Sequence, residues 1–154
     1  GTARSYSGAC SYGGDKGIFG YGYAGSRVSM TNLVSNTGVV GTDVSAVGTA
    51  RSLPAACGYG TDKGIFGFGT TGSYTAVTNL VSNTGVIATD TSGVGTTRSA
   101  LAATQYDGDK GIFGYGNDGS VTDESNLVSN VGVVASDVSG VGTAREYLAA
   151  CSWG

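Results

Sequence analysis

The chain has 154 residues, of which 29 are glycine and 12 % are charged, and its net charge is −3. This length indicates a single domain, and the acidic balance excludes a protein that binds nucleic acid through a basic surface. Hydrophobic residues make up 40 % of the chain, but no apolar run reaches the roughly 20 residues of a membrane span. We therefore expect a folded, glycine-rich domain that binds neither nucleic acid nor membrane.

A repeat of 47 residues organises the sequence. The words Asp-Lys-Gly-Ile-Phe-Gly and Asn-Leu-Val-Ser-Asn each occur three times at this spacing, and the arginine of the word Gly-Thr-Ala/Thr-Arg recurs four times. Their first residues are Asp15, Asp62 and Asp109, then Asn32, Asn79 and Asn126, then Arg4, Arg51, Arg98 and Arg145. We interpret residues 1–154 as one repeat domain with three full copies and a fourth start. The copies are 1–47, 48–94, 95–141 and the partial copy 142–154.

Each full copy predicts four short strands. In the first copy they cover residues 6–12, 17–21, 28–35 and 38–43, and Gly, Asp, Asn and Ser turn signals separate them. The frequent glycines argue against helix. Four antiparallel strands in about 47 residues are typical of one blade of a β-propeller. The alternatives are a β-trefoil, which has no place for residues 142–154, and a solenoid.

The order of residues within each copy carries a family resemblance. An Arg is followed by small residues, then Asp-Lys, then an apolar strand ending in glycines, then a strand with Asn. The second copy reads Arg51-Ser52, Ala55-Ala56, Asp62-Lys63, Ile65-Phe66-Gly67-Phe68-Gly69 and Asn79-Leu80-Val81. This order resembles the kelch repeat over essentially the whole chain. Gly-Tyr/Phe-Gly replaces the kelch double glycine, and Val40, Ile87 and Val134 replace its tryptophan. The resemblance implies a propeller that acts as a binding or assembly module.

The small residues that open each copy predict an innermost strand close to the propeller axis. We expect Phe19, Phe66 and Phe113 to supply the apolar bulk between blades. Propellers have about 4–8 blades, so three blades leave two uncovered flanks that need a partner. The partner we expect is the chain itself, as a homodimer of six blades, or the neighbouring blades of a longer array.

The residues that could carry chemistry favour structural roles. Histidine is absent, which removes the commonest general base and metal ligand. Cys10, Cys57 and Cys151 occupy one repeat position, and we interpret them as small buried thiols. We therefore expect no enzyme activity, no cofactor and no metal. The spacing of Asp43 and Arg51 predicts a clamp between neighbouring strands, and a ring of arginines that binds anions is the alternative.

The copies differ most between the second and third expected strands, in residues 23–30, 70–77 and 117–124. Variable loops on a constant framework are typical of a binding scaffold, and also of relaxed surface drift. Our candidate ligand-binding residues are Tyr23, Arg27, Tyr74, Asn117, Asp118 and Asp123. Aromatic rings with polar tips suit a protein or a glycan ligand. The alternative functions are a purely structural self-assembling repeat protein and a β-trefoil lectin. The low charge and the many Ser, Thr and Gly residues are compatible with an extracellular or virion surface.

Overall fold

The computed structural model describes residues 1–45 and 47–152, and the described chain is all-β, as predicted. It contains three antiparallel sheets, each formed by one copy of the repeat and ordered as the strands follow in sequence. The sheets are β1 (Gly8–Tyr12), β2 (Lys16–Gly20) and β3 (Thr31–Val34); β4 (Ala55–Tyr59), β5 (Lys63–Gly67) and β6 (Thr78–Val81); β7 (Ala102–Tyr106), β8 (Lys110–Asn117) and β9 (Val121–Val128). No described segment is a helix able to cross a membrane.

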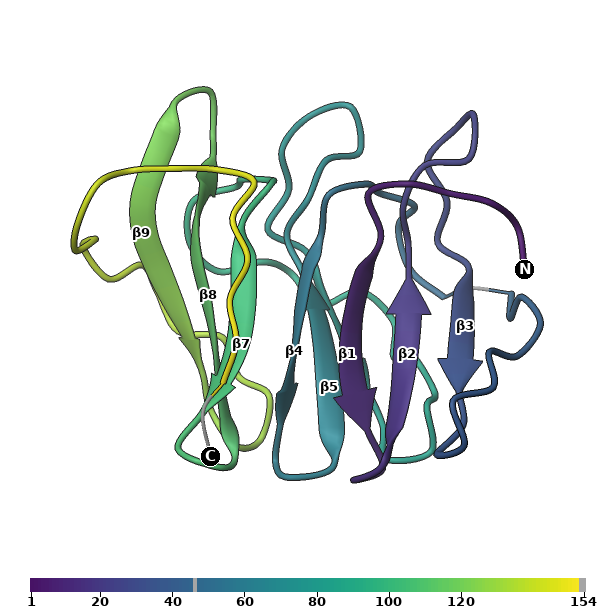
Figure 1. The fold of residues 1–154 in the computed structure, drawn as a ribbon. Helices are drawn as coiled ribbons and strands as arrows, with labels where there is room; N and C mark the ends of the chain where they lie inside the picture. Colours follow the sequence, from purple (N-terminus) through teal and green to yellow (C-terminus); the bar gives the residue numbers. More distant parts are fainter. Residues whose placement is uncertain (46, 153–154) are drawn as a thin grey trace.

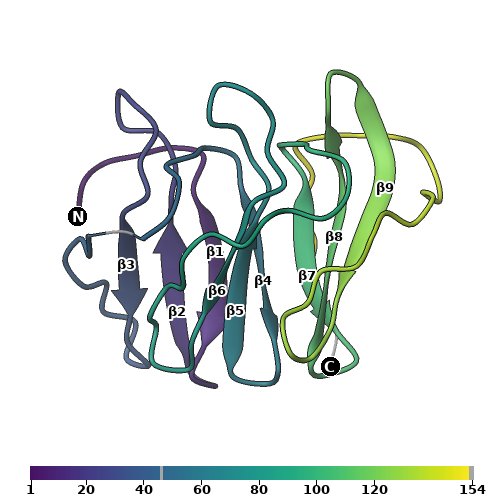
Figure 2. The ribbon, with the colours of Figure 1, turned by 180° about the vertical axis from the view of Figure 1, so that it is seen from behind.

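The three sheets stand side by side in chain order (Figure 1), with the first and third sheets at opposite flanks when the molecule is seen from behind (Figure 2). The leading strands β1, β4 and β7 are neighbours. Equivalent residues from all four repeat starts line one small hollow. These residues are Tyr6, Leu53, Ala100 and Tyr147. The small-residue strands β1, β4 and β7 therefore lie next to one another from sheet to sheet.

The fourth strand expected in each copy is not a regular strand, because side chains interrupt its ladder. In the first copy two isolated bridges join this segment to β3: Val34 with Val40, and Thr31 with Val44. Between them the Asn32 amide donates to the Gly41 carbonyl at 3.1 Å and to the Asp43 carboxylate at 2.9 Å. The side chain thus takes an acceptor that a neighbouring backbone N–H would use in a continuous ladder. Each sheet consequently has three strands.

The core lies between neighbouring sheets. Phe66 on β5 packs over the first sheet, and its ring comes within 2.8 Å of the place where a side chain on Gly20 would begin. Phe113 on β8 packs in the same way over Gly67, at 2.7 Å. Both phenylalanines are fully buried, as predicted, whereas the equivalent Phe19 is 44 % exposed. The difference arises because no sheet precedes the first one among the described residues.

The Gly-aromatic-Gly word makes a sharp change of direction at the end of β2 and of β5, and a register shift within β8. Tyr21 has a left-handed backbone with φ of 61°, and its equivalents Phe68 and Tyr115 have φ of 62° and 64°. Such values are costly for bulky residues. At Gly22 a Cβ would lie 2.6 Å from the Ser5 carbonyl oxygen, so only glycine fits. This turn aims each aromatic ring at the arginine of the following copy.

The partial fourth copy docks on the third repeat as each full copy docks on its predecessor. Gly116 N–H donates to the Arg145 carbonyl at 3.0 Å, which matches the bond from Gly22 to Arg51 at 2.9 Å. Tyr147 N–H also donates to the Ala100 carbonyl at 2.9 Å. Residues 142–152 therefore hold the place of a next repeat start.

Candidate functional site

The three variable loops project from one edge of the molecule, at the top in Figure 1. Each loop is a tight hairpin closed by one cross-strand pair. These pairs are Tyr23 with Arg27, Thr70 with Tyr74, and Asn117 with Val121. The sequence folds this way because Gly-Ser at the tip supplies a residue with positive φ. The constant strands thus present the residues that differ between copies.

A polar hollow of about 510 Å³ opens beside the second and third loops. Tyr74 Oη donates to Asn117 Oδ1 at 2.7 Å, so the hollow joins side chains from two different repeats. The lining combines aromatic, hydroxyl, amide and carboxylate groups. Its residues are Leu53, Thr70, Gly72, Ser73, Tyr74, Ser99, Asn117, Glu146 and Tyr147. Two of the predicted candidate residues therefore meet here.

The chemistry of this hollow suits a neutral ligand rich in hydroxyl groups. Tyr74 and Tyr147 are both exposed, and an exposed ring can stack on the apolar face of a ligand. The Ser and Thr hydroxyls and the Asn117 amide offer donors and acceptors around the rings. Glu146 is the single charged residue of the lining. A few placed polar groups beside aromatic surface are typical of small-molecule sites.

The other predicted site residues lie elsewhere. Tyr23 and Arg27 pair with each other in the first loop, outside the lining of the hollow. Asp118 accepts the Ser120 N–H at 3.1 Å and so stabilises the third hairpin turn. Asp123 lines a separate cavity on the outer side of the third sheet. The predicted set is therefore divided among four places.

Sequence reasoning missed two notable members of the hollow. Glu146 stands where the three full copies have Ser5, Ser52 and Ser99, and Tyr147 stands at a position that also varies between copies. A residue that departs from its equivalents is the same signal that singled out the loops. The signal was available at the repeat starts, but only the fold shows that a repeat start lies beside these loops.

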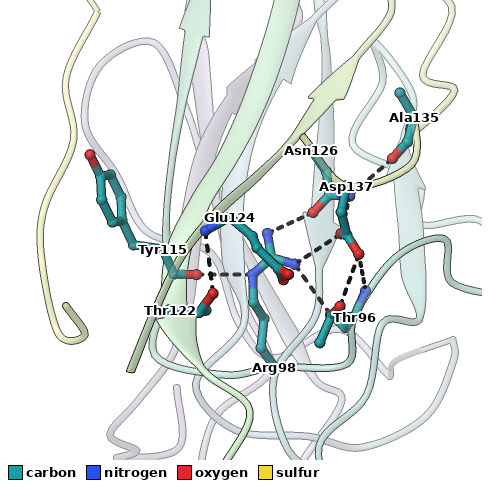
Figure 3. A network of polar contacts seen from close by, with 8 residues as sticks. All are labelled: Thr96, Arg98, Tyr115, Thr122, Glu124, Asn126, Ala135 and Asp137. Carbon is teal, nitrogen blue, oxygen red and sulfur yellow. Dashed lines mark hydrogen bonds and ion pairs between the residues drawn. The ribbon is translucent and has the colours of Figure 1, made fainter. Parts of the chain in front are cut away.

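A buried polar network lies beneath the third loop (Figure 3). Arg98 donates from Nε to the Tyr115 carbonyl at 2.9 Å and from Nη2 to Asn126 Oδ1 at 2.6 Å. Its Nη1 lies 3.7 Å from Asp137 Oδ1. The guanidinium also stacks on the Phe68 ring of the preceding repeat, 4.4 Å from the ring centre. Arg98 thus ties its own repeat together and joins it to the previous one.

Burial decides the role of these arginines. Arg51 and Arg98 have no exposed surface, and burial lowers the pKa of both guanidinium groups. An anion in solvent cannot reach them, so the alternative of an anion-binding ring is wrong for these two. The predicted pairing of Asp43 with Arg51 is also wrong. Asp43 lies 3.8 Å from Arg4 of its own repeat, because each repeat end folds back on its own start.

The cysteines and carboxylates form no metal site in the described chain. Within residues 1–45 and 47–152, no three His, Cys, Asp or Glu side chains gather closely enough to hold a metal ion. Cys57 is buried, and burial raises the pKa of its thiol to about 12. Cys10 is half-buried and Cys151 is exposed, which corrects the expectation of three buried thiols. The reason is that no described sheet packs over residue 151.

Neither a protein-family model nor a curated protein matches this sequence.

Proposed function

We propose that the chain is a non-enzymatic binding module whose polar hollow recognises a saccharide. The observation that carries the proposal is the hydrogen bond of Tyr74 with Asn117, which unites two variable loops at one hollow. Sugars present apolar ring faces and many hydroxyl groups, and this lining offers aromatic rings together with neutral polar groups. The absence of histidine from the sequence is in keeping with binding rather than catalysis.

We also propose that the three sheets are kelch-like propeller blades. Several features support blades over a β-trefoil. The sheets stand side by side, the leading strands are neighbours, and equivalent residues of successive copies line a common hollow. The partial copy 142–152 continues the series at the third sheet, whereas a trefoil would be complete with three copies.

The experiment is a glycan array with the wild-type protein, followed by calorimetric titration of the best sugar. Tyr74→Phe keeps the ring but removes the hydroxyl, which holds Asn117 in place and is itself available to a ligand in the hollow. We expect affinity to fall about tenfold, which is about 1.4 kcal/mol. Tyr23→Phe is the matched control, because Tyr23 lies in the first loop outside the hollow. An array without any bound sugar would overturn the proposal. Equal losses of affinity in the two variants would show that the sugar does not bind in the hollow.

A further inference from the structure

The molecule contains two junctions between neighbouring sheets, and both are built in the same way. The first sheet and the third sheet each expose one side of a further junction of this kind. We call the side of the first sheet that bears Phe19 the leading face, and the side of the third sheet that bears Gly114 the trailing face. At both interior junctions a phenylalanine from one sheet sits over a glycine of the sheet before it, Phe66 over Gly20 and Phe113 over Gly67. On the trailing face, no described atom lies within 4 Å of the place where a Gly114 side chain would begin.

The surroundings of Gly114 match an interior junction with its phenylalanine missing. Phe66 meets the Tyr21 ring edge-on at 5.2 Å, and Phe113 meets Phe68 at 5.1 Å. Tyr115 holds the equivalent place on the trailing face. Arg145 stacks on it at 4.3 Å, as Arg51 stacks on Tyr21 at 3.9 Å. The aromatic-arginine half of the junction is thus assembled on the trailing face.

The backbone offers a second matching element. Gly13 N–H donates to the Asp62 carbonyl and Gly60 N–H donates to the Asp109 carbonyl, both at 2.7 Å. These bonds join the first hairpin turn of one repeat to that of the next. The equivalent pair across the ends of the molecule is Asp107 N–H on the trailing side and the Asp15 carbonyl on the leading side.

The trailing face has a cavity, and the leading face has an exposed aromatic ring. A largely apolar cavity of about 630 Å³ opens on the third sheet, and its lining includes Ala102, Gly114, Tyr115, Leu148 and Ala149. On the leading face Phe19 is 44 % exposed, although its two equivalents are fully buried. A ring that is buried at two identical places and exposed at the third marks a surface that another sheet covers.

We propose that a second copy of this chain covers the trailing face, head to tail, with its Phe19 seated over Gly114 and against Tyr115. Each contact joins the trailing face of one copy to the leading face of the other, and the two-fold axis relates the two contacts. Two such contacts close a dimer of six sheets, related by a two-fold axis. The contacts at the proposed interface are those of the two interior junctions, where a phenylalanine of one sheet covers a glycine of the sheet before it.

Residues 142–152 of one copy and residues 1–11 of the other are both repeat starts, so at the contact they compete for the same position beside β2. One of the two segments must therefore be displaced when the copies join. Leu148-Ala149-Ala150 repeats the interior word Leu101-Ala102-Ala103, whereas the first copy has Ser7-Gly8-Ala9. We therefore assign the place to residues 142–152 of one copy, which then pair with β2 of the other. Residues 142–152 of the first copy thus take the place of β1 in the second copy. The hydrogen bonds between β1 and β2 are lost, and equivalent hydrogen bonds to β2 replace them.

The test uses two variants of the whole chain that each damage one face. Phe19→Ser removes the ring but keeps the socket, and Gly114→Leu fills the socket but keeps the ring. In the single chain both changes fall on open positions, so circular dichroism spectra like that of the wild type verify that each variant folds. We expect sedimentation to give the wild type twice the 15.2 kDa mass of one chain, and each variant alone the mass of one chain.

A mixture of the two variants tests whether Phe19 and Gly114 belong to the same contact. In the mixed pair one contact is intact, because Phe19 of the Gly114→Leu chain docks on the socket of the Phe19→Ser chain, and the other contact carries both changes. Each variant alone has two damaged contacts, so the mixture should form a one-to-one pair that is weaker than the wild-type dimer. A wild type that stays a single chain at its highest soluble concentration would overturn the proposal, as would a variant that still dimerises alone or a mixture that does not pair. Sugar binding is measured separately on the same chains, so either proposal can fail without the other.

Discussion

The last glycine of each Asp-Lys-Gly-Ile-Phe-Gly word is the socket for the next sheet: Gly20, Gly67 and Gly114. At Gly67 a Cβ would lie 2.7 Å from the Phe113 ring, whereas at Gly114 the same Cβ would meet no described atom within 4 Å. The two residues occupy one repeat position, so they differ in packing rather than in local sequence. They form a matched pair for measuring the energy of the junction.

We expect Gly67→Ala to lower the free energy of unfolding by about 1–3 kcal/mol, because overpacking a filled contact forces neighbouring atoms apart. In the Phe19→Ser chain, where no partner ring fills the socket, Gly114→Ala should leave stability nearly unchanged. Urea unfolding followed by circular dichroism measures both. Equal effects at the two positions would show that Phe113 does not pack on Gly67 as described.

At this scale the sequence predicted which kind of residue forms the core, but not which copies of that residue are buried. The repeated Ile-Phe word correctly predicted that Phe66 and Phe113 lie between sheets. It could not distinguish Phe19 from them, because the three phenylalanines have the same neighbours in sequence. Their burial depends on whether another sheet precedes them, which is a property of the arrangement in space.

At the scale of the element, each repeat is closed by a strap between its first residues and its last aspartate. In the first repeat Thr2 donates to the Asp43 carboxylate from N at 2.9 Å and from Oγ1 at 2.7 Å. Thr49 with Asp90 and Thr96 with Asp137 repeat the strap. The bonds from Thr2 and Asn32 lower the pKa of Asp43 to about 2. At Asp90 burial acts in the opposite direction, but the bonds from Thr49 and Asn79 still lower its pKa.

These straps predict a loss of stability in acid. A folded-state pKa of about 2 against 3.8 in the unfolded chain means that Asp43 stabilises the fold above pH 4 or so, and that this contribution disappears as the pH falls toward 2. Asp43→Asn should therefore melt below the wild type at neutral pH, and the two curves should converge near the acid end. Melting temperatures across this range provide the measurement. A constant difference at every pH would contradict the role of the carboxylate.

The candidate site was predicted in part at this scale. Variation between copies singled out Tyr74 and Asn117, and the structure brings them together. The same signal singled out Arg27 and Asp118, which lie in the first and third hairpins outside the hollow. Sequence shows which residues vary, but the packing of one repeat beside the next decides which variable residues share a surface.

At the scale of the whole molecule, identical units placed side by side leave one uncovered face at each end. The 47-residue period and the all-β class follow from the sequence, since repeated words and glycine-rich turns are local features. The three-stranded sheets do not, because the Asn32 side chain interrupts the ladder of the fourth strand that the turn signals suggested. The docking of residues 142–152 on the third sheet likewise depends on contacts far apart in sequence.

The measurement that tests this packing most directly is the proton NMR spectrum of the Phe19→Ser variant, with the glycine Hα signals assigned. A proton held over an aromatic ring is shifted upfield by the ring current. Because Phe66 covers Gly20 and Phe113 covers Gly67, we predict strong upfield shifts at these two glycines and none at Gly114. Ordinary Hα shifts at all three glycines would contradict the account.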